Sequence, residues 1–334
     1  MKFLKNGFLI LVIALSLLII SACGDESDTD SSDKGSGLIL KFGHVLAPDH
    51  PYQLGAEKFK EIIEENAPEP VTVEIYGSSE LGSERDLTEG MQLGTVDMAL
   101  VPGTINSFEP NLGVLDLPFI FRDREHAYKV LDGEIGQELA ADLPSKDLRL
   151  LAYWENGFRH VTNSSKPINT PEDLAGLKIR VPENNVYVDT FNEWGANVTS
   201  MAFGELYTAL QQKTIDAQEN PIALIYTNKF HETQDYLSLT GHFYGPAHLI
   251  MSEQTWNSLS PEMQEVVTRA AEEARDYQRN LLLEKDEEYI KSLEEAGVQI
   301  NEIDIEAFQK AAEPVWEKYE KQYGEMIERI QEVQ

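Results

Sequence analysis

A short charged stretch near the middle of the chain carries the first side chain that could bind a ligand. In GLKIRVPENN, residues 176–185, apolar residues alternate with Lys178 and Arg180. This alternation predicts a β-strand that ends at Pro182. An arginine near the end of a strand could hold an anion, but charged residues on a strand edge also keep that edge soluble. On this stretch alone, both interpretations remain open.

The net charge of the chain bears on whether Arg180 binds an anion. The chain has 27 Lys and Arg against 58 Asp and Glu, which gives a net charge of −31 at pH 7. Such a protein is a poor partner for nucleic acid and for anionic lipid surfaces. It also repels an anionic ligand at long range, so a site for one requires positive groups concentrated locally.

Catalysis receives little support from the sequence. We find no histidine cluster with metal-ligand spacing, no nucleophile elbow and no glycine-rich phosphate loop. His44 and His50 flank Pro48 and are more typical of a loop than of a catalytic pair. We therefore expect no enzyme, no cofactor and no metal. A secreted enzyme acting on carboxylates remains a competing class, and a structural lipoprotein is a third.

The first residues predict export. A basic start is followed by an aliphatic run from Phe8 to Ile20, which is shorter than the roughly 18 to 20 residues of a spanning helix, so residues 1–22 are predicted to be a signal peptide. Residues 20–23, ISAC, resemble a bacterial lipobox, and Cys23 is the only cysteine of the chain. We expect Cys23 to carry a diacyl anchor, whose two chains suffice for stable attachment.

The segment after Cys23 has no apolar residue before Leu38, and this predicts a lipidated disordered tether over residues 23–37. The expected location is extracytoplasmic, either lipid-anchored on the outer face of the cell membrane or periplasmic.

Two successive sets of elements must position Arg180. The first set is predicted to contain strands at 38–45, 71–77 and 96–101, with helices at 51–65 and 84–93. Alternating strands and helices indicate a doubly wound parallel sheet, whose ligands lie at the carboxyl ends of the strands. A long strand predicted at 147–157 then leads the chain out of the first lobe. The second set repeats the order, with strands at 178–181, 196–201 and 214–220 and helices at 186–194 and 203–212.

The rest of the chain is predicted to complete two lobes. Residues 237–252 can cross back to the first set, residues 261–296 form a long helical region, and residues 305–333 form a final amphipathic helix. The fold class is therefore α/β, a two-lobed binding-protein-like fold with hinge strands and long C-terminal helices. Lobe I is assigned to 38–156 plus about 246–285, and lobe II to 157–245 plus about 286–334.

Four long motifs carry a family resemblance that covers nearly the whole mature chain. NGFRHVTNSSKPINTPEDLAGLKIRVPEN and MAFGELYTALQQKTIDAQENP resemble the solute-binding subunit of the tripartite ATP-independent periplasmic (TRAP) transporters, also called the DctP-like family. LGSERDLTEGMQLGTVDMAL and DLPFIFRDREHAYKVLDG are similar to the same family. The resemblance implies a receptor that captures an organic acid, closes around it and delivers it to a membrane permease.

The resemblance also implies which residues bind the acid. Arg180 matches the buried arginine that makes a two-point salt bridge with the ligand carboxylate, a geometry that suits a planar guanidinium. Arg159 matches a family position beside the carboxylate, Asn220 resembles the amide that completes carboxylate recognition, and Phe203 matches an aromatic that packs on the ligand. His242 resembles a histidine of the cleft that holds water, whereas Glu219 is interpreted as structural.

The ligand class is inferred from polar residues near predicted strand ends. Glu183, Glu80, His44 and Trp154 offer acceptors and an aromatic plate suited to hydroxyl groups. Residues 101–103, VPG, lack the acidic side chain that sialic-acid receptors of the family use. A sugar acid, either a hexuronate or an aldonate, is the expected ligand, and a C4-dicarboxylate is the alternative. We expect the receptor to be a monomer.

Overall fold

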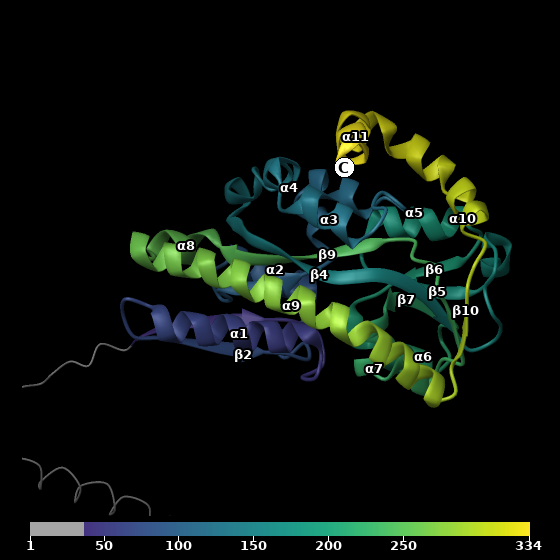
Figure 1. Cartoon of the computed structure of the whole chain (residues 1–334), viewed down its shortest axis with the longest axis horizontal. Coiled ribbons are helices and arrows are strands. Elements are labelled where there is room, and N and C mark those ends of the chain that lie inside the picture. Colours follow the sequence, from purple (N-terminus) through teal and green to yellow (C-terminus); the bar gives the residue numbers. More distant parts are fainter. Residues whose placement is uncertain (1–36) are drawn as a thin grey trace, which may run out of the picture. The chain divides into compact units, whose positions relative to one another are not determined.

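The computed structural model describes residues 37–334 (Figure 1). The predicted signal peptide, Cys23 and all but one residue of the predicted tether lie outside these residues. Within residues 37–334, no helix combines the length and apolar character required to cross a membrane.

The described strands form one mixed sheet. Its main path, from one edge to the other, is β2 (Val71–Tyr76), β1 (Leu38–Gly43), β3 (Met98–Val101), β9 (Tyr244–Ser252), β4 (Leu148–Asn163), β7 (Ala217–Pro221), β5 (Lys178–Val181) and β6 (Asn197–Ser200). Two short strands leave this path, β8 (Tyr236–Ser238) beside β4 and β10 (Gln299–Asn301) beside β8.

The two predicted strand-helix sets are confirmed as two parallel triplets. β1 lies between β2 and β3 and is parallel to both, and β5 lies in the same way between β6 and β7. The antiparallel strands β9 and β4 join the triplets, as the middle of Figure 1 shows. We call β1, β2, β3 and their helices the first half, and β5, β6, β7 and theirs the second half.

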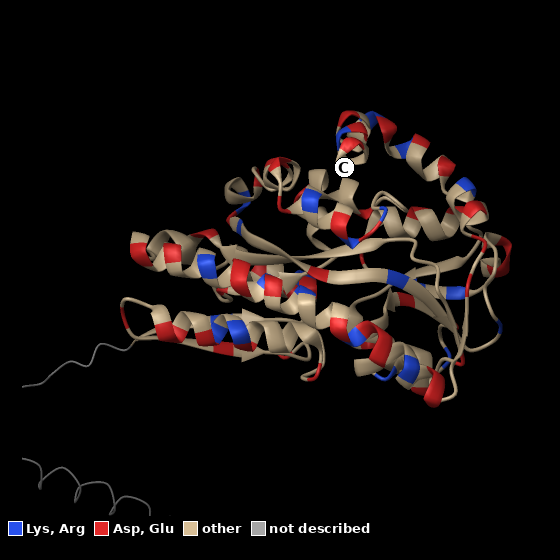
Figure 2. Ribbon diagram, viewed as in Figure 1, with Lys and Arg blue, Asp and Glu red and all other residues tan. Residues whose placement is uncertain are grey.

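Helices cover the sheet on both faces. They are α1 (Pro51–Asn66), α2 (Glu84–Gln92), α3 (Arg124–Leu131), α4 (Glu134–Leu139), α5 (Asn185–Glu193), α6 (Leu206–Gln211), α7 (Ile222–Thr227), α8 (Glu253–Ser258), α9 (Pro261–Glu295), α10 (Ile305–Ala311) and α11 (Glu313–Glu332). Figure 2, a ribbon coloured by residue type, shows many Asp and Glu positions along α9 and α11. The apolar sides of these helices face the protein, which is the usual arrangement for amphipathic helices.

Local chemistry explains where key helices begin and end. The Ser83 hydroxyl accepts a hydrogen bond from the Asp86 amide, and the Asp86 carboxylate accepts one from the Ser83 amide, so a capping box begins α2. The prediction of one final helix over 305–333 was wrong, because α10 ends at Ala311 and α11 begins at Glu313. Pro314 at the start of α11 has no amide hydrogen to continue α10.

The long strand β4 passes from the first half to the second. Its residues 148–158 pair with β9, and residues 159–163 pair with β7. The register with β9 shifts between Glu155 and Gly157, where Gly157 has φ +115°. A residue with a side chain rarely adopts this conformation, so glycine permits the irregularity at the crossing.

The helix α9 joins both halves from one side. It packs against α1 and β4, and farther along against α7, and Figure 1 shows it running diagonally past these elements. Trp154 of β4 lies fully buried under it, beside Phe42. Gly55 of α1 lets that helix approach Trp154, because an added Cβ would lie 2.6 Å from the indole. The assignment of residue ranges to two lobes stays a prediction.

Candidate functional site

A small cavity of about 20 Å³, enough for about one water molecule, lies between the two halves. Its walls come from loops after β1 and β3, from the start of α2, and from β4, β5, β7 and their following segments. The lining residues are Leu46, Glu84, Pro102, Gly103, Asn156, Arg159, Arg180, Pro182, Phe203, Asn220 and Leu224. The carboxyl ends of parallel strands from both halves therefore meet here, which is the usual place for a ligand in such sheets.

Arg180 is the buried cation of this cavity that lacks a carboxylate partner. It is 2% exposed, and its Nε and Nη2 both donate to the carbonyl oxygen of Met201, at 2.9 and 2.6 Å. Within residues 37–334, no carboxylate oxygen lies within 4.0 Å of its guanidinium nitrogens. Burial lowers the pKa of Arg180 to about 10, so the group is still charged at neutral pH. Such a charge favours an anionic ligand.

Arg159 also lines the cavity, but its charge is already compensated. Its Nε and Nη2 donate to the two carboxylate oxygens of Glu219, at 2.5 and 2.7 Å. Burial works against the charged guanidinium, yet the Glu219 carboxylate raises the pKa of Arg159 above its usual value. Burial likewise disfavours the charged carboxylate, and Arg159 nevertheless holds the pKa of Glu219 below its usual range. The pair is a buried salt bridge with two-point geometry.

Asn220 and Phe203 complete the group of predicted residues that meet in the cavity. The Asn220 Oδ1 accepts a hydrogen bond from Arg159 Nη2 at 3.0 Å, and its amide nitrogen donates to Gln218. Phe203 begins the short turn before α6, and the Arg180 guanidinium lies 6.0 Å from its ring centroid. The structure thus brings Arg180, Arg159, Asn220 and Phe203 together from segments that are distant in the sequence.

Three other predicted residues lie outside the cavity lining. Glu183 follows β5, and its carboxylate lies 3.4 Å from the Nε of Arg85 in the first half. His44 follows β1 and pairs with Gln53 through its Nε2 at 2.8 Å, and burial lowers the pKa of this histidine. Glu80 is exposed in the turn after β2.

Trp154 and His242 are fully buried and likewise do not line the cavity. The indole nitrogen of Trp154 donates to the carbonyl of Ala271 in α9 at 3.1 Å, so the ring packs in the core and does not offer a plate to a ligand. His242 contacts Thr240 through Nδ1 at 2.7 Å and Glu219 through Nε2 at 3.3 Å. His242 therefore helps to hold the Glu219 carboxylate in its pair with Arg159, and it does not face the cavity.

Sequence reasoning missed Glu84, the acid of the cavity. It is the first residue of α2, and the capping box at Ser83 fixes its position. Burial raises the pKa of Glu84 to about 7, although a hydrogen bond with Thr104 and the positive charges of Arg180 and Arg159 lower it in part. The side chain keeps some accessible surface because it lines a cavity. The sequence signal that could have found Glu84 is its place at the first residue of the helix predicted at 84–93, which follows the strand predicted at 71–77.

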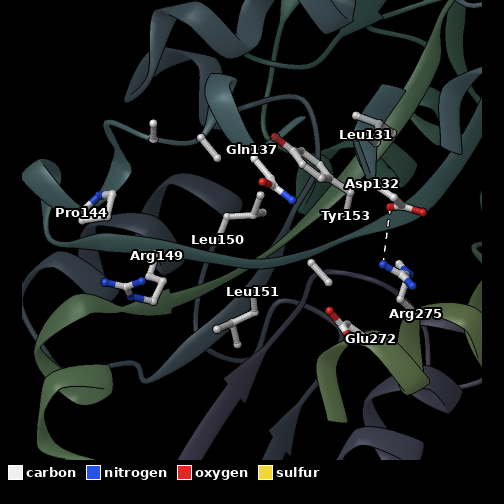
Figure 3. Close-up of a pocket in the computed structure, with 13 residues that line it drawn as sticks. Leu131, Asp132, Gln137, Pro144, Arg149, Leu150, Leu151, Tyr153, Glu272 and Arg275 are labelled. Carbon is white, nitrogen blue, oxygen red and sulfur yellow. Dashed lines mark ion pairs between the residues drawn. The ribbon is translucent and has the colours of Figure 1, made fainter. Parts of the chain in front are cut away.

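A second hollow lies away from this chemistry. Figure 3 shows it between α4, the beginning of β4 and α9, lined by Leu150, Leu151 and Tyr153 among others. Both arginines of the hollow have acidic partners, since Arg275 lies 3.5 Å from Asp132 and Arg149 makes a two-point pair with Glu253. This hollow therefore offers no uncompensated arginine to an anionic ligand. In the part of the chain that the structure describes, no cluster of three or more His, Cys, Asp or Glu could hold a metal ion.

Comparisons with known proteins identify the family of the chain. The family model described as "Bacterial extracellular solute-binding protein, family 7", DctP, matches residues 42–322. The 2,3-diketo-L-gulonate-binding periplasmic protein YiaO of Escherichia coli is 38% identical over 302 residues, which cover 88% of this chain and 92% of that protein.

Two solved structures show the same fold with different acids. A TRAP periplasmic solute-binding protein from Polaromonas, bound to D-erythronate, has a TM-score of 0.87 and 43% identity, with 89% of this chain and 99% of that chain covered. One from Sulfurospirillum deleyianum, with bound succinate, has a TM-score of 0.85 and 35% identity, with 89% and 99% covered.

Proposed function

Because the chain belongs to family 7 of the bacterial extracellular solute-binding proteins, the receptors of TRAP transporters, we propose that its ligand is a sugar acid, either a hexuronate or an aldonate. The receptor works outside the cytoplasm, and we propose that it delivers the acid to the permease subunits of its transporter. The relatives that bind 2,3-diketo-L-gulonate and D-erythronate support this ligand class.

The observation that carries the proposal is the uncompensated charge of Arg180 inside the cavity. A ligand carboxylate can meet a planar guanidinium through two parallel hydrogen bonds, which lysine cannot offer. Nε and Nη2 of Arg180 both donate to the carbonyl oxygen of Met201. The ligand carboxylate would accept the remaining hydrogen bonds of the guanidinium from the cavity side. Arg159 and Asn220 lie beside the same space and are proposed to complete carboxylate recognition.

The other polar groups of the cavity suit hydroxyl groups. Glu84 offers acceptor oxygens, and Asn156 and Asn220 offer amides. A sugar acid presents one carboxylate and several hydroxyls, so it matches one uncompensated arginine and several neutral or acidic partners. A C4-dicarboxylate is the alternative, which the succinate-bound relative favours, but its second carboxylate would meet Glu84 without a second uncompensated cation.

Binding and closure are proposed to be one event. The cavity walls come from both halves of the sheet, and β4 and β9 connect these halves. A closed cavity without an acid would leave Arg180 buried and uncompensated, so the ligand favours the closed arrangement by supplying the missing charge. The permease would then recognise the closed, loaded receptor.

Thermal unfolding with a panel of acids tests the ligand class. A ligand at about 100 times its Kd stabilises a protein by about 2.7 kcal/mol, which for a chain of this size raises Tm by several degrees. We expect galactonate, glucuronate or erythronate to raise Tm, and succinate, malate and fumarate to have little effect. The reverse ranking would establish a dicarboxylate receptor, and no response to either group would contradict both interpretations.

A further inference from the structure

We propose that Asn184 is a positioning residue that holds the two halves of the sheet together in the closed receptor without contacting the ligand. This inference rests on the proposed function, because it concerns how the closed, loaded state is stabilised. Asn184 is 2% exposed and does not line the cavity. It is the N-cap of helix α5 in the second half, and it follows the cavity residue Pro182 closely in the chain.

The side-chain amide of Asn184 has two separate tasks. Its Oδ1 accepts hydrogen bonds from the backbone amides of Val186 and Tyr187, at 2.9 and 3.3 Å, and so caps α5. Its Nδ2 donates to the carbonyl oxygen of Gly103 and to Oδ2 of Asp116, each at 2.8 Å. Both hydrogens of Nδ2 are therefore engaged outside the helix that the residue caps.

The acceptors of Nδ2 belong to the connection that follows β3 of the first half. Gly103 comes directly after this strand and lines the cavity, and Asp116 ends the short helical turn Pro110–Asp116. An added Cβ at Gly103 would lie 3.8 Å from Nδ2 of Asn184 and 3.9 Å from Pro182, so the two halves contact each other here. Opening of the cavity between Gly103 and Pro182 must therefore break the hydrogen bond from Asn184 to Gly103.

The carboxylate of Asp116 strengthens this contact. Asp116 is 4% exposed, and burial raises its pKa to about 7, although the hydrogen bond from Asn184 lowers it in part. The carboxylate also accepts hydrogen bonds from Asn106 and from the Tyr187 hydroxyl, at 3.0 and 3.4 Å. A hydrogen bond to an ionised carboxylate is roughly twice as strong as one between neutral groups. The donor of Asn184 therefore contributes to a buried anion that would otherwise lack one of its partners.

A second polar contact between the halves is weaker. Arg85 and Glu183 lie 3.4 Å apart, but their side chains are 42% and 39% exposed. Water and salt screen such a pair, which typically contributes little to stability. The buried amide of Asn184 is therefore the contact that we expect to determine how firmly the halves are held.

The substitution Asn184→Asp separates the two tasks of the side chain. Aspartate caps a helix as well as asparagine does, but its carboxylate has no hydrogen to donate and repels the carboxylate of Asp116. Adding Asp116→Asn to the same chain restores one donor and one acceptor with their roles exchanged. If Asn184 only capped α5, this second substitution would restore nothing.

The experiment is a double-mutant cycle at pH 8, where Asp116 is ionised. Calorimetry with galactonate and with succinate measures affinity. We expect Asn184→Asp to weaken binding of both acids by the same factor, about tenfold or more, and the double variant to recover most of this loss. Asp304→Asn is the matched control, because Asp304 caps α10 by accepting from Ala307 of its own helix, and it should bind like the parent.

A distance measurement adds a readout that requires no ligand. Spin labels are placed at Leu93 and Gln212, which are exposed positions at the ends of α2 and α6 in opposite halves. The labels are attached to introduced cysteines in a Cys23→Ala background, so that no other thiol reacts. We expect the fraction of closed, short-distance molecules to fall in Asn184→Asp and to rise again in the double variant.

The outcomes separate the two proposals. If the parent binds galactonate but Asn184→Asp keeps its affinity and its distance distribution, the role of Asn184 is wrong and the proposed function stands. A changed ratio of the two affinities also contradicts the inference, because a residue that does not contact the ligand acts on both acids alike. If the parent binds no acid, the proposed function fails, and the distance distributions still decide the inference.

Asn184→Ser keeps the test decisive if Asn184→Asp fails to fold. Serine is a good N-cap residue, but its side chain is too short to reach both Gly103 and Asp116. We expect the same loss of affinity for both acids and the same fall in the closed fraction. Parent-like values in Asn184→Ser would overturn the inference.

Discussion

Two buried arginines in one cavity have different electrostatic states, and this difference is the reason why we propose Arg180 as the ligand anchor. Arg159 is neutralised by Glu219, with which it shares two hydrogen bonds, whereas Arg180 donates only to a backbone carbonyl among the described residues. A buried charge with a carboxylate partner is already compensated, whereas one without such a partner favours an anionic ligand.

Removing the guanidinium of Arg180 should abolish tight binding. We expect Arg180→Ala to weaken binding of the acid by about 3 kcal/mol or more, roughly a hundredfold, because the ligand carboxylate loses its only uncompensated cation. Arg180→Lys should recover little, since an ammonium cannot form the two-point contact. Calorimetry measures both. Arg149→Ala, which removes a paired arginine outside the cavity, is the control. Binding by Arg180→Ala within threefold of the parent would contradict the assignment.

Removing the partner of Arg159 should instead destabilise the fold. We expect Glu219→Ala to lower the free energy of unfolding by about 3 to 5 kcal/mol, because it leaves a buried guanidinium unpaired. Urea unfolding measures this loss. Glu138→Gln, which breaks an exposed pair with Arg329, should leave stability nearly unchanged.

The pH dependence of stability should report the same pair. The folded pKa of Glu219 is depressed, so its contribution is fully present above the unfolded pKa and is lost as the pH falls through the folded pKa. The parent should therefore lose stability below about pH 4.5, whereas Glu219→Gln should show a shallower loss in that interval. Equal acid sensitivity in both proteins would argue against this account.

Among the elements, β4 has the most demanding geometry, because one strand serves both halves of the sheet. Its register with β9 shifts at Gly157, and an added Cβ there would lie 3.3 Å from Pro221. We expect Gly157→Ala to lower the free energy of unfolding by about 1 to 3 kcal/mol, since alanine is strained at φ +115°.

Gly204→Ala is the matched control for this substitution. Gly204 does not have a positive φ, and the atom nearest to an added Cβ is 3.5 Å away, at Ser79. Its effect on stability should stay within about 0.5 kcal/mol. Chemical unfolding of both variants makes the comparison, and equal losses would mean that the backbone conformation at residue 157 is not the cause.

The complete receptor must bind its ligand and must also stay close to the permease in the membrane. Cys23 and the predicted tether lie outside the described residues, so the lipid anchor is a proposal from the sequence motif. We expect the mature protein to fractionate with membranes and Cys23→Ala to move to the soluble or secreted fraction, because two acyl chains provide stable attachment.

The same variant separates anchoring from binding. Cys23→Ala should keep its ligand-induced rise in Tm, because the cavity is built entirely from residues 46–224. Uptake should fall, since the loss of the anchor lowers the local concentration of the receptor at the membrane. A variant that stays membrane-bound would indicate an uncleaved anchor, and one that no longer binds ligand would show that the N-terminal segment contributes to the fold.

Local patterns were enough to predict much of this protein. Alternating and helical periodicities predicted both parallel triplets and most of the helices, and the motif around Arg180 predicted the family, whereas the role of Arg180 as the ligand anchor stays a prediction. These features depend on neighbouring residues, whose spacing and capping chemistry are visible in the chain. The sequence did not predict the break between α10 and α11 at Ala312, because the apolar periodicity continues through this residue.

The distribution of charge inside the cavity was decided only by the tertiary structure. Strand β4 pairs with β7 and so places Glu219 against Arg159, 60 residues away, which leaves Arg180 as the uncompensated arginine. Packing of α9 over β4 buries Trp154 in the core, although it occupies a predicted strand end. Glu84 of α2 and Arg180 of β5 line the same cavity although they are almost 100 residues apart in the chain. Such pairings depend on strand order and layer packing, and no local pattern of residue types specifies them.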